Sequence, residues 1–339
     1  MCAKRLGEAT ISLDNAPGVL ASASCAGKKE GEGPLARYFD YIAPDARCGE
    51  KSWEKAESAL LRRCFELCCG RAGLAPEALD CVVSGDLLNQ CAGSAYALRE
   101  SGAPYLGLYG ACSTMSEGLA AASMLIDGGG MGNVAVCTSS HFCSAERQFR
   151  YPLEYGSLRA PTSQWTVTGA GAVILSRGAP PPYVNLITVG RIVDMGVTDA
   201  SDMGAAMAPA AADTLARHFA DTGRDFADYD AVITGDLGVT GSDILRELLG
   251  MEGCAPDARY FDCGAVIFDP KRQGVCSGGS GCGCSASVFA GYVLGNMRSG
   301  RWKRVLFAAT GALMSPTTSA QGESIPGICH AVALENGRD

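Results

Sequence analysis

The order of apolar and polar positions repeats once along the chain. In the first copy, a helix-like run over residues 56–72 precedes the short apolar segment 79–87, which ends in Gly-Asp-Leu. In the second copy, a helix-like run over residues 211–222 precedes the apolar segment 229–237, which also ends in Gly-Asp-Leu. Self-similarity of this kind indicates an internal duplication of a helix–strand–turn unit.

Each copy continues with a small-residue turn, a helix-like run and two apolar strands. In the first copy these are the turn 110–113, the helix-like run 116–126 and the strands 133–138 and 171–175. In the second copy they are the turn 281–285, the helix-like run 286–297 and the strands 304–309 and 330–334. Short, near-continuous apolar strands are typical of sheets that are covered on both faces. The pattern therefore predicts an α/β fold with parallel sheets and helices on their faces.

The chain is long enough for two fused halves around a large core. It has 339 residues, of which 47% are hydrophobic and 19% charged, a composition typical of a compact globular protein. Pro180–Pro182 is a run of three prolines that continues neither a helix nor a strand ladder. We place the crossover there and expect an N-terminal half at residues 1–178 and a C-terminal half at residues 179–339.

Charge and hydropathy exclude several classes of protein. The net charge of −8 and the isoelectric point near 5.0 argue against a nucleic-acid binder, which would carry a basic face. No apolar run approaches the ~20 residues that a transmembrane helix needs. Residues 1–14 contain no apolar core of a secretory signal. The sequence therefore predicts no signal peptide, no transmembrane segment and no nucleic-acid partner.

The cysteines are expected to be free thiols. There are seventeen of them, and without a secretory signal this number indicates a reducing compartment. Cys276, Cys282 and Cys284 lie close together, but their Cys-x5-Cys-x-Cys spacing is a poor template for zinc ligands. We therefore predict no metal site.

The turn of the first copy carries the clearest chemistry in the sequence. Cys112, in Gly-Ala-Cys-Ser, directly precedes a helix-like run. The free backbone N–H groups and the dipole of a helix N-terminus lower the pKa of a thiol there. The same groups also bind anions. Cys112 is therefore either a nucleophile or the floor of an anion pocket.

Several motifs resemble those of known families. Residues 168–175 are similar to the Gly-Asp-Gly-Ala-Gly-Ala strand motif of the ketoacyl synthase III branch of the thiolase superfamily. Over nearly the whole chain the sequence resembles the stage V sporulation protein AD family of spore-forming bacteria. The segments that carry this resemblance are 85–90, 110–115, 138–142, 145–150, 164–172, 309–318 and 322–327.

The resemblance implies a fold, a ligand and a location. The fold is thiolase-like, with two duplicated βαβαβ-type halves stacked as α-β-α-β-α layers, and members are usually homodimers. The function is that of a sporulation protein that binds dipicolinic acid, or its calcium chelate, for uptake into the developing spore. The location is the cytoplasmic side of the spore inner membrane, as a soluble protein held peripherally by other stage V sporulation A-operon membrane proteins. No cofactor is expected beyond calcium carried with dipicolinate.

The resemblance also bears on catalysis. Condensing enzymes of this superfamily need a His and a second His or Asn beside the cysteine. By the same resemblance, Gly235 stands at the position of the catalytic His and Cys282 at the position of the Asn. We therefore predict a degenerate pocket retained for binding. A condensing acyltransferase that acts through acyl-Cys112 is the alternative.

A dicarboxylate needs cationic or N–H donors, and arginine suits planar carboxylates best. His141 follows a strand at the carboxyl end, where open parallel sheets place ligands. Arg147 lies shortly after it, near Arg150 and Tyr151, although an ion pair with Glu146 or Glu154 explains this arginine equally well. The candidate ligand-binding residues are Cys112, His141, Arg147, Asn89, Gln90 and His330.

The histidines have structural alternatives. His141 as a locally satisfied turn residue and His330 as a hydrogen-bonded core residue fit the sequence as well as ligand contacts do. His218 lies in a polar helix-like run, and we expect it at the surface. None of the three stands where the resemblance would place the catalytic His.

Overall fold

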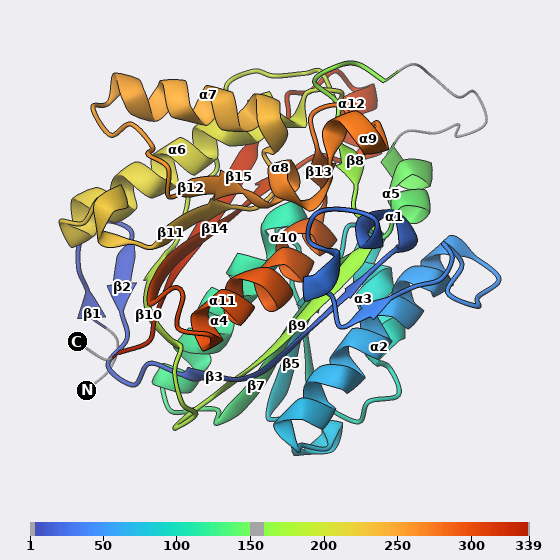
Figure 1. Ribbon diagram of the computed structural model, residues 1–339, viewed down its shortest axis with the longest axis vertical. Helices are drawn as coiled ribbons and strands as arrows, with labels where there is room; N and C mark the ends of the chain where they lie inside the picture. The colour runs from blue at the N-terminus through green and yellow to red at the C-terminus, as the bar shows by residue number, and fades with distance from the viewer. Residues whose placement is uncertain (1–3, 150–158, 338–339) are drawn as a thin grey trace.

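The computed structural model describes residues 4–149 and 159–337. Its main sheet has the strand order β12-β11-β14-β15-β10-β3-β9-β7-β5-β6 (Figure 1). The strands on the N-terminal side are β3 (Gly18–Ala26), β5 (Cys81–Gly85), β6 (Tyr105–Gly107), β7 (Asn133–Ser140) and β9 (Gly169–Ser176). Those on the C-terminal side are β10 (Tyr183–Thr188), β11 (Ala231–Thr234), β12 (Tyr260–Asp262), β14 (Arg304–Ala312) and β15 (Gly327–Glu335).

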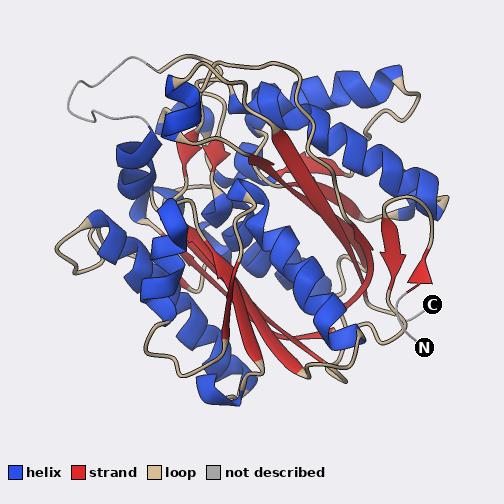
Figure 2. Cartoon of the chain, turned by 180° about the vertical axis from the view of Figure 1, so that it is seen from behind, coloured by secondary structure: helices blue, strands red, loops and turns tan. Residues whose placement is uncertain are grey.

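The two sides of this sheet have the same order of strands, which confirms the duplication. From the centre outward, β3-β9-β7-β5-β6 matches β10-β15-β14-β11-β12. The two groups meet where Tyr183 of β10 pairs with Gly18 of β3. Figure 2 shows the two groups of strands with helices between them and outside them.

The strand directions differ from the all-parallel prediction. Within each copy, β5, β6 and β7, or β11, β12 and β14, are parallel. The closing strand of each copy is antiparallel to its neighbours: β9 to β3 and β7, and β15 to β14 and β10. A parallel neighbour requires a connection that crosses back over the sheet. The connection from β14 to β15 stays at one end of the sheet, so the strands pair antiparallel.

Helices complete five layers. The long helices are α2 (Trp53–Ala72), α4 (Thr114–Asp127), α6 (Met203–Thr222) and α7 (Gly238–Met251), and α10 (Cys282–Val288) continues into α11 (Leu294–Arg298). Helix α2 packs on β3 and β9, and α6 packs on β14 and β15. Between the two groups of strands, α4 contacts β7 and β15 while α10 contacts β7 and β9. The structure is therefore a thiolase-like α-β-α-β-α stack.

The remaining elements are short. The helices are α1 (Lys28–Gly31), α3 (Ala92–Leu98), α5 (Phe142–Phe149), α8 (Cys263–Ile267), α9 (Pro270–Gln273) and α12 (Pro316–Ala320). The strands are β1 (Lys4–Arg5), β2 (Thr10–Ser12), β4 (Tyr41–Ile42), β8 (Trp165–Thr166) and β13 (Gly279–Ser280). Over the described ranges, none of the helices combines the length and the apolar character needed to cross a membrane.

Helix capping explains where α2 and α6 begin and end. The side chains of Ser52 and Asp202 accept hydrogen bonds from backbone N–H groups in the first turns of α2 and α6. Gly73 and Gly223 then end the two helices in the left-handed conformation, which glycine adopts without steric cost. The two copies thus share their helix boundaries as well as their strand order.

The small residues of the strand motif allow the middle layer to pack closely. A Cβ added to Gly171 of β9 would lie 2.2 Å from the backbone oxygen of Ala286 in α10. A larger residue would push the helix off the sheet. This contact holds the start of α10 against the strand ends that carry the site.

Candidate functional site

Cys112 lies where the sequence placed it, at the start of α4. The turn Ala111–Ser113 leads directly into that helix, and Ala111 has a φ of 49°, a strained value for a residue with a Cβ. Side-chain hydroxyls hold the turn, because Ser113 and Thr114 donate hydrogen bonds to the backbone oxygens of Gly110 and Ala111. The cysteine itself is only 7% exposed.

The environment of Cys112 disfavours a thiolate, contrary to the prediction from the helix terminus. Burial raises the pKa of the thiol well above its usual value, and the carboxyl group of Asp236 beside it raises the pKa further. Desolvation and a neighbouring negative charge both penalise the thiolate, and together they outweigh the helix dipole. Cys112 is therefore a protonated thiol at neutral pH.

Asp236 is the polar centre of this site, and the sequence prediction did not include it. It is fully buried, and burial raises its pKa to about 6. Its carboxylate accepts hydrogen bonds from the Gly281 N–H at 2.8 Å, the Ser280 hydroxyl at 3.1 Å and the Thr310 hydroxyl at 2.9 Å. It also interacts with the thiol of Cys112. These contacts connect the first-copy turn to three segments of the second copy.

The two positions that the resemblance assigns to catalytic partners carry no base. A Cβ added to Gly235 would lie 2.9 Å from the backbone nitrogen of Thr310, so a histidine does not fit there without movement of the strands. Cys282 is fully buried at the start of α10, and its thiol donates a hydrogen bond to the backbone oxygen of Ser139 at 3.2 Å. Neither of these two positions therefore supplies a base for Cys112.

The cavity at Cys112 is small and mostly apolar. Its volume is about 40 Å³, which is room for a few water molecules. Its apolar wall includes Leu87, Phe149, Met203 and Met314, and the described residues that line it include no lysine or arginine. An anion placed there would meet the carboxyl group of Asp236, and no cation of the described lining would compensate for it.

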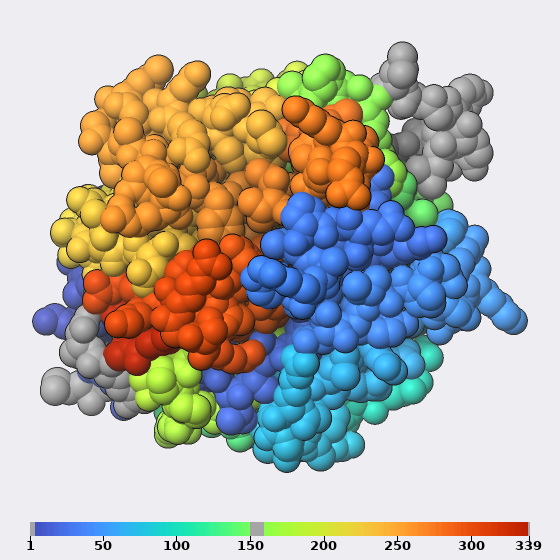
Figure 3. Space-filling view, in the orientation of Figure 1, coloured from blue at the N-terminus to red at the C-terminus, as the bar shows by residue number. Residues whose placement is uncertain are grey.

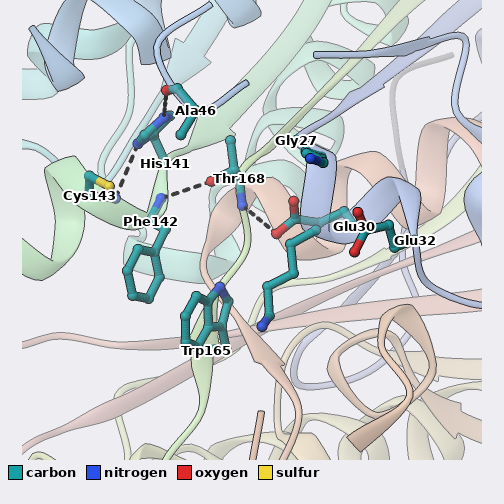
Figure 4. Close-up of a pocket in the computed structure, with 11 residues that line it drawn as sticks. Gly27, Glu30, Glu32, Ala46, His141, Phe142, Cys143, Trp165 and Thr168 are labelled. Carbon is teal, nitrogen blue, oxygen red and sulfur yellow. Dashed lines mark hydrogen bonds between the residues drawn. The ribbon is translucent and has the colours of Figure 1, made fainter. Parts of the chain in front are cut away.

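A larger cavity lies on the other side of β8 and α5 (Figure 4). Its volume is about 450 Å³. Trp165 lines it, whereas the next residue, Thr166, lines the pocket of Cys112. Likewise Phe142 and Cys143 of α5 line the large cavity, while Ala145 lines the small one. Strand β8 and helix α5 therefore form a wall between the two cavities.

Two aromatic rings and two cations gather at the large cavity. Phe142 and Trp165 stack with their ring centroids 4.0 Å apart and their planes 11° from parallel. The ammonium of Lys29 lies 4.1 Å from the centroid of Trp165, and the guanidinium of Arg159 lies 4.8 Å from it. Both distances are typical of cation–π contacts.

Helix α1 supplies the opposite wall of this cavity. Lys29 donates a hydrogen bond to the backbone oxygen of Gln273 in α9 at 2.7 Å, and the side chain of Gln273 donates to the backbone oxygen of Lys29. Figure 3 shows this blue N-terminal segment lying against the orange segment that contains α9. Burial lowers the pKa of Lys29 despite the neighbouring Glu30.

Glu30 is the acidic group of the large cavity. It is 1% exposed, and its carboxylate accepts a hydrogen bond from the N–H of Thr168 at 3.0 Å. Burial raises the pKa of Glu30 to about 7, and this hydrogen bond only partly offsets the effect. Glu30 therefore changes its charge close to neutral pH.

His141 lines the large cavity but has no ring nitrogen left for a ligand. Its Nε2 lies 2.7 Å from the backbone oxygen of Ala46, and its Nδ1 accepts a hydrogen bond from the N–H of Cys143 at 3.1 Å. The ring also stacks on Trp53, with centroids 5.8 Å apart. Burial lowers the pKa of His141, which keeps the ring neutral. The structure thus favours the locally satisfied histidine while leaving its ring in the cavity wall.

Asn89 and Arg147 line a third, shallower hollow of about 310 Å³. Arg147 forms an ion pair with Glu54 of α2, a partner that was not expected from the sequence. The N–H of Asn89 donates to the side chain of Gln148 at 3.0 Å. Gln90 is exposed with a φ of 59° and does not line this hollow. Arg150, Tyr151 and Glu154 lie outside the described residues.

The other two histidines are structural. His330 accepts a hydrogen bond from the N–H of Gly190, lines none of these cavities, and has a pKa lowered to about 4 by burial. His218 is fully buried between Thr188 and Tyr229, with contacts of 2.7 and 2.6 Å. The expectation that His218 is a surface residue is wrong, because its face of α6 packs against the sheet.

The described ranges contain no group of three or more His, Cys, Asp or Glu side chains placed to hold a metal ion. The sixteen cysteines described as free include Cys276, Cys282 and Cys284.

Comparison with known proteins decides the family. The family model described as stage V sporulation protein AD matches residues 7–335. The chain is 42% identical over 332 residues to stage V sporulation protein AD of Bacillus subtilis (strain 168), covering 98% of both chains. This chain belongs to the stage V sporulation protein AD family.

Solved structures show the fold. The 3-oxoacyl-[acyl-carrier-protein] synthase III of Aquifex aeolicus VF5 aligns with a TM-score of 0.58 at 14% identity, over 94% of this chain and 100% of that one. The E117Q variant of OleA from Xanthomonas campestris aligns with a TM-score of 0.59 at 13% identity, over 96% and 99% of the two chains. These likenesses establish the thiolase-like architecture of this family member.

The sequence-based set of site residues omitted Lys29, Glu30, Arg159 and Asp236. Asp236 had a usable signal, because Gly-Asp-Leu occurs in both copies and both aspartates, Asp86 and Asp236, are buried. Phe142 and Trp165 stood in motifs that carry the family resemblance, but nothing in those motifs places their rings together. Lys29 and Glu30 lie in an ordinary polar stretch, and no sequence motif there indicates a site.

Proposed function

We propose that this protein binds dipicolinic acid, or its calcium chelate, for uptake into the developing spore, and that it does not condense acyl groups. Membership in the sporulation family supports the ligand. The absence of condensing activity is inferred from the state of Cys112. Its thiol is protonated beside Asp236, and a glycine, Gly235, stands where a catalytic histidine is expected. A thiol with a raised pKa, without a histidine at position 235 and in a cavity of about 40 Å³, is a poor condensing catalyst.

Calorimetric titration tests the ligand. Purified protein is titrated with dipicolinate alone and with dipicolinate plus equimolar calcium, and benzoate serves as an aromatic monocarboxylate control. We expect saturable heat with dipicolinate and much weaker heat with benzoate, because the second carboxylate adds a charged contact. Absence of heat up to millimolar dipicolinate, with and without calcium, would refute the proposed ligand.

The second candidate is an acyltransferase that acts through acyl-Cys112. It is favoured by one observation, the position of Cys112 at the start of α4 beside a cavity. The test is incubation with acyl-CoA followed by intact-mass analysis of the wild type and of Cys112→Ser. An acyl adduct that disappears in Cys112→Ser would establish this candidate, and no adduct is expected.

We also propose a homodimer in which the edge strand β6 lies at the interface. Tyr105 and Leu106 of β6 are exposed, as are Tyr96 and Tyr109 nearby in the sequence. An exposed apolar edge strand is a template for pairing with another chain. Leu106→Lys should convert the dimer to a monomer in sedimentation velocity, while Leu6→Lys, at another exposed leucine, should not. A monomeric wild type would refute the dimer.

We propose that attachment to the spore inner membrane runs through the other stage V sporulation A-operon membrane proteins. The net charge of −8 disfavours direct adsorption to anionic lipid. Fractionation of sporulating cells should find the protein with the inner membrane only when those proteins are present. Flotation of the pure protein with anionic vesicles would contradict this proposal.

A further inference from the structure

We propose that one face of the molecule docks an acidic segment of a protein partner. The face is a patch of four partly buried aromatic side chains with two exposed arginines at its rim. We name it the aromatic–arginine patch, and its residues are Tyr38, Phe261, Tyr292, Trp302, Arg37 and Arg301. That the partner is a membrane protein rests on the attachment proposed above. The surface and the acidic character of the partner rest on the patch itself.

The aromatic side chains of the patch form one connected cluster. The ring centroid of Tyr292 lies 4.8 Å from that of Tyr38 and 5.4 Å from that of Trp302, and both pairs are edge-to-face. The ring of Phe261 lies 6.0 Å from that of Tyr292 and 5.9 Å from that of Trp302. Such contacts hold each ring in one orientation. All four residues remain partly exposed, so the cluster presents a fixed aromatic surface to solvent.

The patch joins the two halves of the chain at a π-helical turn. Phe289–Val293 form this turn between α10 and α11, and Tyr292 belongs to it. A Cβ added to Gly291 would lie 2.4 Å from the backbone oxygen of Tyr38, so the missing side chain lets the N-terminal segment pack on the turn. Figure 3 shows the blue N-terminal segment lying against the red-orange segment that contains α11. Single π-helical turns within α-helices are frequent at functional sites.

Among the described residues, no acidic side chain pairs with the arginines of the patch. The guanidinium of Arg37 lies 4.8 Å from the ring centroid of Tyr38 and donates a hydrogen bond to its hydroxyl at 2.9 Å. Burial raises the pKa of Tyr292, and the nearby charge of Arg301 partly offsets this rise. Neither arginine forms an ion pair within the described ranges. A partner's carboxylates would therefore meet two guanidinium groups that no carboxylate of the described chain neutralises.

The acidic residues nearest to the patch in the sequence are engaged elsewhere. Asp40 accepts two hydrogen bonds from Arg71, of 2.6 and 2.7 Å. Asp262 is fully buried and accepts a hydrogen bond from the Thr234 hydroxyl. Residues 270–322 contain no Asp or Glu but six Lys or Arg. In a chain with a net charge of −8, this local excess of positive charge attracts an acidic partner.

A protein surface fits this patch better than a lipid or a nucleic acid does. The rings pack against one another and against the core, so they cannot insert into a bilayer without losing these contacts. The negative charge of the whole chain disfavours nucleic acid. Tyr, Trp and Arg are enriched at the energetic centres of protein interfaces, and arginine binds carboxylates with two parallel hydrogen bonds. The patch therefore favours a partner segment with Asp or Glu beside apolar side chains.

Site-specific photocrosslinking in sporulating cells tests the surface. Lys303, an exposed neighbour of Trp302, is replaced by p-benzoylphenylalanine, and the exposed Lys55 on α2 is replaced in the control. The crosslinked peptides are sequenced by mass spectrometry. We expect position 303, and not position 55, to crosslink one membrane protein through a segment with more acidic than basic residues.

Charge reversal then tests the arginines. Arg37→Glu/Arg301→Glu should lower the yield of the crosslink at least about tenfold, whereas Arg37→Lys/Arg301→Lys should retain most of it. Lys55→Glu/Arg99→Glu, a pair of exposed cations outside the patch, is the matched control and should behave as the wild type does. Replacement of the partner's crosslinked acids by lysine should restore the crosslink to the Glu variant. Each variant is first checked for a cooperative thermal transition, and Arg301→Glu alone decides if the double variant does not fold.

The outcomes separate this inference from the proposed attachment. If no crosslink exceeds the level at position 55, or if the crosslink persists in Arg37→Glu/Arg301→Glu, the surface is wrong, while fractionation can still show attachment through other contacts. A crosslink to phospholipid or to nucleic acid also overturns the inference. If the charge-sensitive crosslink leads to an acidic segment of a soluble protein, the surface stands and attachment to the membrane through it fails.

Discussion

Two cavities lie back to back in this molecule, and they differ in every property that decides binding. The pocket of Cys112 is small, apolar and beside a buried carboxyl group, whereas the cavity of Trp165 is about ten times larger and carries cations. The pocket of Cys112 lies where the cysteine motif of the sequence predicts a site. The second cavity is lined by Phe142 and Trp165, which lie in the segments 138–142 and 164–172, but the sequence of these segments does not indicate a cavity. The comparison teaches that a cysteine at a helix start does not by itself make an anion pocket, because burial and neighbouring charges decide the chemistry of the cavity.

The largest effect should come from breaking the centre of the small pocket. Asp236→Ala leaves three buried donors without their acceptor, from Gly281, Ser280 and Thr310. We expect the free energy of unfolding in urea to fall by about 2–4 kcal/mol. Asp194→Ala, which removes an exposed acceptor, is the control and should change little. Equal behaviour of the two variants would show that Asp236 is not a structural centre.

The next effect concerns the reactivity of Cys112. Because burial and Asp236 raise its pKa, Cys112 should be alkylated by iodoacetamide at least about tenfold more slowly than the partly exposed Cys276. Peptide mapping after timed quenching measures both rates in one sample. If Cys112 is modified faster than Cys276, the helix terminus lowers the pKa of its thiol more than burial raises it. The Cys112 pocket would then favour negative charge, contrary to the comparison of the two cavities.

The smallest effect concerns the charge of Glu30 in the large cavity. The charged or titratable groups that line the cavity with it include Lys28, Lys29, Glu32 and His141. Its pKa of about 7 means that it is neutral below neutral pH and negative above it. An anionic ligand should therefore bind more weakly as the pH rises from 6 to 8, by roughly three- to tenfold.

Glu30→Gln sharpens this test, since it keeps an acceptor for Thr168 but removes the charge. The variant should bind dipicolinate at pH 8 about as well as the wild type does at pH 6. Calorimetry across this pH range measures both proteins. If Glu30→Gln shows the same pH dependence of binding as the wild type, another group causes that dependence and the charge of Glu30 does not affect binding in the cavity.

Much of the fold could be predicted because apolar runs and small-residue turns are local signals. The segments 79–87 and 229–237 lead to the matching strands β5 and β11, and the turns at Cys112 and Gly281 lead into α4 and α10. The direction of β9 and β15 could not be predicted in this way. A closing strand has the same apolar pattern whether it pairs parallel or antiparallel, and the path of the connection decides.

The candidate site was harder to predict because its contacts join distant segments. The sequence placed Cys112 and His141 in one pocket, whereas in the structure they line two different cavities. His330 and His218 are held by core hydrogen bonds that their sequence neighbours do not reveal. A histidine's role depends on the partners of both ring nitrogens, and these partners lie far away in the chain.

The sequence by itself determined the duplicated α/β fold, the family and the position of Cys112 at a helix start. Hydrophobic periodicity and turn residues are local signals, so they can be interpreted without knowing which segments pack together. Only the tertiary structure decided that Asp236 keeps Cys112 protonated and that Lys29 meets Trp165. Desolvation and charge proximity depend on which segments fold together. The chain separates Lys29 from Trp165 by 136 residues and Cys112 from Asp236 by 124 residues.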